Sequence, residues 1–161
     1  MKRRRSCTIR VFIYLFLGIK VTLVYINQGT NALKNLSVHI VEDEIIIALD
    51  LEDILEDMGH DVDVSYTIKD AMDKAAEQKT DLFLIDIHMH GADTGLKLGE
   101  ELQKRNVPHI YLSAYTDEET REMAASTQSL GYLSKPFNEN EFKKILQGAA
   151  NQIDQNQKPD T

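Results

Sequence analysis

Short apolar runs alternate with amphipathic segments from Leu36 onward, about five times over. Runs of four or five residues rich in β-branched and aromatic side chains are typical of buried parallel strands, and the longer segments between them have the spacing of crossover helices. The predicted strands are residues 38–41, 62–66, 82–86, 109–113 and 131–134. The pattern therefore predicts an α/β domain in which a helix follows each of five parallel strands.

Three of the predicted helices have a clear boundary in the sequence. The first covers residues 44–58, where apolar residues recur at helical spacing and Gly59 stands where a C-terminal cap belongs. Capping-box patterns open the last two helices, at Thr116 with Glu119 and at Asn138 with Glu141. The predicted buried stripe of the last helix is Phe142, Ile145, Leu146, Ala149 and Ile153.

Residues 1–36 form a different kind of segment, with seven basic residues and no acid around an apolar run at residues 11–26. As a helix this run would rise about 24 Å, short of the roughly 30 Å hydrocarbon core of a bilayer. Lys20 interrupts it, and no site of small residues typical of signal cleavage follows it. An unstructured leader, a membrane anchor and a secretory signal all remain open, and membrane contact is expected only if residues 11–26 act as an anchor.

Composition and charge narrow the class of protein. The chain has 161 residues, 42% of them hydrophobic, which suits one packed domain, expected at residues 37–150 with a polar tail at 151–161. Beyond residue 36 there are 11 bases against 26 acids, a charge of -15 that disfavours direct nucleic-acid binding. The single cysteine, Cys7, excludes an internal disulfide or a cysteine-based zinc site. We therefore expect a reducing, cytoplasmic location.

Candidate chemistry gathers at the ends of the predicted strands, where open parallel sheets bind their ligands. The residues at these ends are Glu42, Asp43, Asp86, Ser113 and Lys135. Carboxylates about 4 Å apart repel by roughly 4 kcal/mol per pair at an effective dielectric near 20, so a cation is needed. A few carboxylates completed by water suit Mg²⁺, and a carboxylate beside Mg²⁺ and a lysine is a competent nucleophile toward a phosphoryl group.

Four segments carry a family resemblance, and they occur in a fixed order along the chain. They are VEDE at 41–44, LIDI at 84–87, LSAY at 112–115 and GYLSKPF at 131–137. With them the chain resembles the receiver domains of two-component response regulators, the CheY-like family, over roughly residues 37–150. The resemblance implies a flavodoxin-like fold, a three-layer α/β/α sandwich around a parallel sheet of strand order 2-1-3-4-5.

The resemblance also implies roles for individual residues. Asp86 is similar to the phosphoacceptor of the family, and Glu42 and Asp43 are similar to the acidic pair. Together with Asp86 and the backbone carbonyl of His88, this pair would coordinate Mg²⁺.

Further roles concern the phosphoryl group and the response to it. Lys135 would contact the phosphoryl group, and the Lys135–Pro136 peptide would be cis. Ser113 would move to hydrogen-bond the phosphate, and Tyr132 would swing inward behind it, so that a protein-binding face changes.

The loop after Asp86 departs from the family pattern. Many receivers have Met-Pro there, whereas here Met89 is followed by His90. His88 and His90 form an H-x-H pair, for which we expect exposed loop residues, with transition-metal binding as the alternative.

The function implied is that of a single-domain response regulator in a phosphorelay. Asp86 would receive its phosphoryl group from a sensor histidine kinase or a histidine phosphotransfer protein, and an unknown downstream protein would read the altered face. Phosphotransfer and slow autodephosphorylation would be its only catalysis, so we do not expect a conventional enzyme. An aspartyl phosphatase or mutase is disfavoured, because His88 stands where a second aspartate belongs; a receiver-like module that is never phosphorylated is the other alternative.

A docking patch is predicted from the helical pattern alone. Ile45 and Leu49 lie opposite the core stripe of the first helix, among acidic residues and near the acceptor site. We expect them to contact the kinase or phosphotransfer partner.

Overall fold

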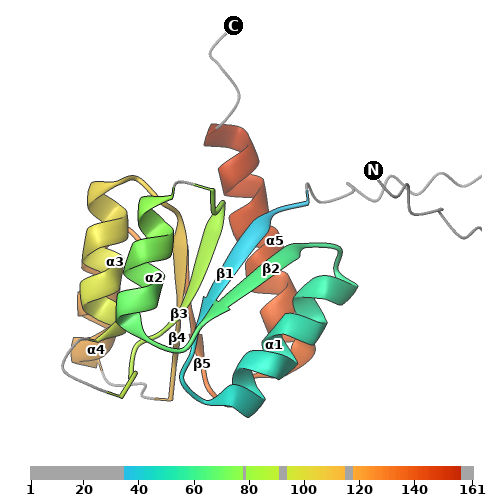
Figure 1. Cartoon of the computed structure of the whole chain (residues 1–161), viewed down its shortest axis with the longest axis horizontal. Helices are drawn as coiled ribbons and strands as arrows, with labels where there is room; N and C mark the ends of the chain where they lie inside the picture. The colour runs from blue at the N-terminus through green and yellow to red at the C-terminus, as the bar shows by residue number, and fades with distance from the viewer. Residues whose placement is uncertain (1–34, 78, 91–93, 115–117, 157–161) are drawn as a thin grey trace, which may run out of the picture. The chain divides into compact units, whose positions relative to one another are not determined.

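The computed structural model describes residues 35–156 apart from 78, 91–93 and 115–117. Strands and helices alternate along this part of the chain (Figure 1). The strands are β1 Ser37–Val41, β2 Asp61–Ser65, β3 Leu82–Asp86, β4 His109–Ser113 and β5 Gly131–Ser134. The helices are α1 Ile45–Asp57, α2 Ile68–Ala76, α3 Gly95–Lys104, α4 Glu118–Ser126 and α5 Glu139–Asn156. The predicted strands and their alternation with helices are confirmed.

All neighbouring strands of the sheet are parallel, and their order is β2-β1-β3-β4-β5. The chain passes from β1 to β2 at one edge and then returns to β3 on the other side of β1. The strand order therefore reverses between β1 and β3, whose carboxyl ends lie side by side because Val41 pairs with Ile85. Ligands of doubly wound sheets bind at such a point.

Helices cover both faces of the sheet, so the described domain has three layers (Figure 1). α1 and α5 pack on one face, in a core that includes Val38, Ile40, Leu51, Phe142 and Leu146. α2, α3 and α4 pack on the other, in a core that includes Val41, Ile68, Ile85, Leu98 and Ala124. Successive strand residues point to opposite faces, which is why both Ile40 and Val41 are buried.

Local sequence signals set the ends of two helices. α1 gives way to Gly59, whose φ of 90° lies in the left-handed region that glycine adopts without steric cost. Before α5, the Glu141 N–H donates to Asn138 Oδ1 at 3.0 Å and the Asn138 N–H donates to Glu141 Oε2 at 3.3 Å. This reciprocal pair is the predicted capping box. The other predicted box begins at Thr116, which lies outside the described residues.

The ends of the described region contribute to the core. Leu36 is buried against the α1 and α5 side of the sheet, and α5 continues to Asn156 with Ile153 buried. The boundaries predicted at residues 36 and 150 stay predictions. No helix within residues 35–156, as far as they are described, is long and apolar enough to cross a membrane. The apolar run at 11–26 lies outside the described residues.

Candidate functional site

The three predicted carboxylates meet at the carboxyl ends of β1 and β3. Glu42 follows β1, and its N–H extends the ladder toward β2 by donating to Ser65 O at 3.1 Å. Asp86 is the last residue of β3, and Asp43 begins the turn into α1. One carboxylate oxygen from each of Glu42, Asp43 and Asp86 lies within 4.8 Å of those of the other two. Sheet topology alone thus brings together residues more than 40 positions apart in the sequence.

Lys135 joins two of these carboxylates. Its Nζ donates to Glu42 Oε2 at 2.6 Å and to Asp86 Oδ2 at 2.8 Å. β4 lies between β3 and β5, so the lysine side chain reaches across the end of β4. Its main-chain N–H donates to Ser113 O at 2.6 Å, and the Lys135–Pro136 peptide is cis.

The charges at this centre are only partly balanced. Burial raises the pKa of Glu42, and the hydrogen bond from Lys135 lowers it by less, so that the pKa stays above its ordinary value. Burial works to lower the pKa of Lys135, but its hydrogen bonds to Asp86 and Glu42 outweigh burial and raise it. Lys135 is therefore protonated. Its ammonium does not fully offset the burial of the Glu42 carboxylate, because it is shared with Asp86. A second cation near these oxygens would stabilise the ionised form of Glu42.

Asp43 has a different partner. Its Oδ2 accepts a hydrogen bond from the His90 main-chain N–H at 2.7 Å and also contacts the His90 imidazole Nδ1. Burial works to raise the pKa of Asp43, but these contacts with His90 outweigh it and lower the pKa. Lys135 thus donates hydrogen bonds to Glu42 and Asp86, whereas His90 donates to Asp43. Sequence reasoning missed this contact, although the H-x-H pattern pointed to the residue.

The loop after β3 is built closely around Asp86. The His88 N–H donates to Asp86 Oδ1 at 3.0 Å, so one carboxylate oxygen is held by the lysine and the other by the main chain. Gly95 opens α3 directly against the strand: a Cβ there would lie 2.2 Å from the Asp86 carbonyl oxygen. Only glycine permits this approach, which brings α3 close behind Asp86.

The two predicted switch residues lie on neighbouring strands. Ser113 ends β4, is wholly buried, and places its Oγ 3.4 Å from His88 Nδ1. Tyr132 lies in β5, half-buried, with the Arg121 guanidinium carbon 5.5 Å from its ring centroid. The side chains are therefore located near the site and near α4, respectively; the motion proposed for them stays a prediction.

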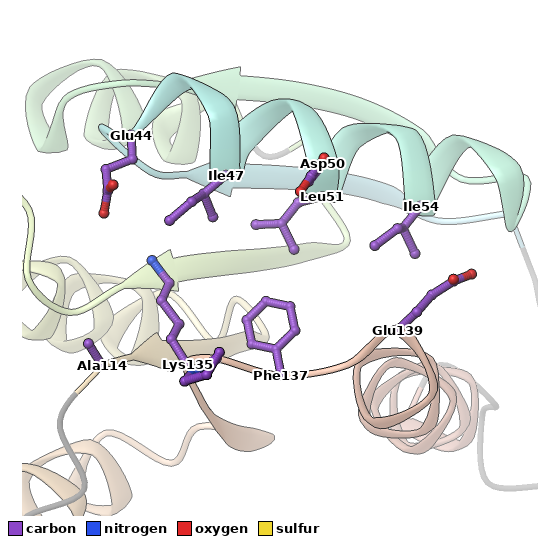
Figure 2. A pocket seen from close by; sticks show the side chains of 10 residues that line it. Glu44, Ile47, Asp50, Leu51, Ile54, Ala114, Lys135, Phe137 and Glu139 are labelled. Carbon is purple, nitrogen blue, oxygen red and sulfur yellow. The ribbon is translucent and has the colours of Figure 1, made fainter.

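A groove of about 590 Å³ lies beside the site, between α1 and the connection from β5 to α5 (Figure 2). Its walls are apolar: Ile47, Leu51 and Ile54 of α1 face Phe137 across it. Two further small or apolar residues and four charged ones complete the lining: Ala114, Pro136, Glu44, Asp50, Lys135 and Glu139. Sequence patterns did not predict this groove, because it forms between α1 and residues that lie far from α1 in the sequence.

The predicted docking residues are exposed on the same helix. Ile45 is 60% exposed and Leu49 is 50% exposed, values that are high for large apolar side chains. Their exposure agrees with the helical pattern.

The three carboxylates fit a small, hard cation. Opposite ligands of an octahedral Mg²⁺ stand about 4.2 Å apart, since each bond is about 2.1 Å, and oxygens within 4.8 Å of one another can share one such ion after small side-chain movements. Oxygen donors completed by water are the set that Mg²⁺ prefers.

The fold and this site together define a doubly wound α/β domain with a lysine-bridged acidic centre at its topological switch point. The sequence model of the response regulator receiver domain matches residues 38–147. The chain belongs to this family, and residues 38–147 are the receiver domain of a two-component response regulator.

Relatives extend this result. The chain is 29% identical over 117 residues to the transcriptional regulatory protein ZraR of Escherichia coli; the match covers 71% of the chain but only 26% of ZraR. The structure resembles the signal receiver domain of a modulated diguanylate cyclase from Desulfovibrio desulfuricans, with a TM-score of 0.69, 29% identity, and coverage of 76% of the chain and 99% of that domain.

A further structural relative holds a metal ion. This is the receiver domain of a sensor histidine kinase from Pseudomonas aeruginosa with magnesium coordinated in its active site cleft, at a TM-score of 0.66, 26% identity, and coverage of 73% of the chain and 98% of that domain. Receiver domains as a family bind Mg²⁺ at an acidic site, work with histidine kinases or phosphotransfer proteins, and are generally not enzymes in their own right.

Proposed function

We propose that Asp86 accepts a phosphoryl group in the presence of Mg²⁺ and that phosphorylation changes a protein-binding face. The observation that carries the proposal is the position of Lys135 Nζ, which bonds both Glu42 and Asp86 beside the Asp43 carboxylate. An ammonium and a cation site flanking one aspartate supply the positive charge that a transferring phosphoryl group requires.

In the proposed reaction an Asp86 carboxylate oxygen attacks the phosphorus of a phosphohistidine on the partner. An O–P bond forms, the N–P bond of the phosphohistidine breaks, and the departing imidazole nitrogen takes a proton from solvent. Lys135 neutralises charge on the transferring oxygens. Mg²⁺, held by Glu42, Asp43, Asp86 and the His88 carbonyl, would supply electrostatic stabilisation of the same oxygens.

The response to phosphorylation is proposed to run through β4 and β5. Ser113 Oγ would exchange its contact with His88 Nδ1 for a hydrogen bond to the phosphoryl group. Tyr132 lies in β5, the strand that pairs with β4, and would then move inward from beneath Arg121. The populations shift only by the difference in interaction free energy between the two arrangements. An unidentified downstream protein would bind the altered face.

The partner that delivers the phosphoryl group is proposed to dock on α1. Ile45 and Leu49 are exposed there, and the apolar groove lined by Ile47 and Phe137 opens between the same helix and the Lys135 segment. A partner helix that covers this surface would bring its phosphohistidine to the end of β3 without crossing another element. Apolar contacts of this kind are a common source of docking energy.

The phosphoacceptor is tested by intact mass after incubation with Mg²⁺ and a small phosphodonor such as acetyl phosphate. The expected result is the gain of one acid-stable, base-labile phosphoryl group, lost when Mg²⁺ is chelated and absent in Asp86→Asn. Circular dichroism checks that the variant is folded. If no phosphodonor modifies the folded wild-type protein, the chain is a binding module and the proposal fails.

A further inference from the structure

Only two of the five histidines are exposed, and both are in the loop after β3. His39, His60 and His109 are buried, whereas His88 and His90 are exposed, with 92% of the His90 side chain accessible. A cation from solvent that binds an imidazole of the folded domain therefore binds at His88 or His90. The two differ in what they contact.

His90 contacts a carboxylate of the acidic cluster. Its main-chain N–H donates to Asp43 Oδ2 at 2.7 Å, and its imidazole Nδ1 reaches the same oxygen. The main-chain bond ties the residue to Asp43, so the position of the ring does not depend on the imidazole contact alone. His88 instead turns its Nδ1 toward Ser113 Oγ, at 3.4 Å.

A nitrogen that contacts a carboxylate oxygen is also within reach of a metal ion bound to that oxygen. Transition metals bind carboxylate oxygens and imidazole nitrogens at about 2.0–2.2 Å, so one ion can hold both atoms as adjacent ligands. Imidazole suits Co²⁺, Ni²⁺ and Zn²⁺, whereas Mg²⁺ prefers oxygen and water. The nitrogen donor therefore changes which metals the cluster favours.

We propose that His90 is a ligand of the cation site formed by Glu42, Asp43 and Asp86, and that it gives this site a preference for imidazole-binding transition metals over Mg²⁺. The inference rests on the proposed function in using the same cation site. It adds that Co²⁺, Ni²⁺ or Zn²⁺ competes with Mg²⁺ there, so that metal supply regulates loading of the site.

The opposite role for His90 makes a different prediction. If the imidazole only covers Asp43 and an incoming cation displaces it, His90 is a competitor. Removing the ring would then strengthen the binding of every divalent cation, Mg²⁺ included.

The test is titration calorimetry of the full chain with Co²⁺ alone and with Mg²⁺ alone. His90→Ala is compared with Lys104→Ala, the loss of another exposed side chain, at the opposite end of α3 from Gly95. We expect His90→Ala to weaken Co²⁺ binding by about tenfold or more and to change Mg²⁺ binding by less than about twofold. Lys104→Ala should keep the wild-type ratio of Co²⁺ to Mg²⁺ affinity.

A spectroscopic measurement identifies the ligand directly. Electron spin-echo spectra of bound Mn²⁺ or Cu²⁺ should carry nitrogen modulation from a coordinated imidazole ring in the wild type and in Lys104→Ala. The modulation should be lost in His90→Ala. Because the replaced side chain is exposed, the variant is expected to fold, which circular dichroism verifies.

The two proposals fail in distinguishable ways. An unchanged affinity ratio in His90→Ala, or tighter binding of both cations, overturns the role of His90, while Mg²⁺-dependent phosphorylation of Asp86 can still stand. A wild-type protein that binds neither Co²⁺ nor Mg²⁺ overturns both.

Discussion

The properties of Lys135 follow from its two partners and its burial. Its side chain is 12% exposed, and it bonds Glu42, which is wholly buried, and Asp86, which is nearly so. Removing one partner of a buried ionic group leaves an uncompensated charge, which is more destabilising than losing an exposed pair. We therefore expect this lysine to stabilise the folded state, in addition to its proposed role of providing charge for phosphoryl transfer.

Lys135→Met tests that dual role. Without the ammonium, burial and Asp86 both disfavour ionised Glu42, so its pKa rises further and the free energy of unfolding falls. We expect a loss of about 2–4 kcal/mol in chelator at neutral pH, reduced when Mg²⁺ is added. Urea unfolding followed by circular dichroism measures both values. Equal stability of variant and wild type in chelator would show that the bridge contributes nothing.

Residues at strand ends were predictable, and residues in loops were less so. Glu42, Asp86 and Lys135 directly follow or end strands of one parallel sheet, so the topology determines where they meet. The contact of His90 with Asp43 depends on the path of a loop and on the direction of its side chains. No periodic pattern encodes either. The sequence alone therefore offered metal binding by His88 and His90 as an alternative, but it did not indicate the contact between His90 and Asp43.

At the scale of elements, α1 contributes to three environments at once. Leu51 and Leu55 pack into the core, Ile47 and Ile54 line the groove, and Ile45 points to solvent with Leu49. A helix that only needed to cover the sheet would place polar residues on its outer side. The exposed apolar residues near the acidic cluster are the observation on which the proposed docking rests.

The double variant Ile45→Ala, Leu49→Ala tests the docking role. We expect phosphotransfer from the cognate kinase or phosphotransfer protein to slow by about tenfold, as for the loss of one interface hot spot. Phosphorylation by acetyl phosphate should be unchanged, because no partner docks in that reaction. Met123→Ala is the matched control, since Met123 is 48% exposed on α4. Equal slowing in the control, or no slowing in the double variant, contradicts the role of α1.

Elements were predicted more completely than the surfaces between them. The boundaries of α1 and the capping box at Asn138 are local features, written in residues a few positions apart. The groove arises because α1 and Phe137 approach from distant parts of the chain. Periodicity specifies which face of a helix is apolar, but not whether a neighbouring element fills the adjacent space.

At the scale of the whole molecule, some ionisable groups lower the free energy of unfolding as pH falls, and others raise it. Burial lowers the pKa of His39, His60 and His109, so the unfolded chain binds protons there more readily than the folded domain. These three destabilise the fold as pH falls below about 6.5. Glu42, whose pKa is raised chiefly by burial, and His90, whose pKa is raised chiefly by its hydrogen bond to Asp43, act in the opposite sense.

His109→Gln isolates one of these contributions. His109 is 2% exposed, and its Nε2 lies 3.0 Å from Thr127 Oγ1, a contact that glutamine can retain. Its stabilising contribution is present above the unfolded-state pKa of about 6.5 and is lost as pH falls below it, by up to about 1.4 kcal/mol per pH unit. The wild type should therefore lose stability more steeply than the variant between about pH 6.5 and 5, whatever their difference at pH 8. Urea unfolding across this range gives both slopes, and parallel slopes would mean that His109 takes up a proton as easily in the folded domain as in the unfolded chain.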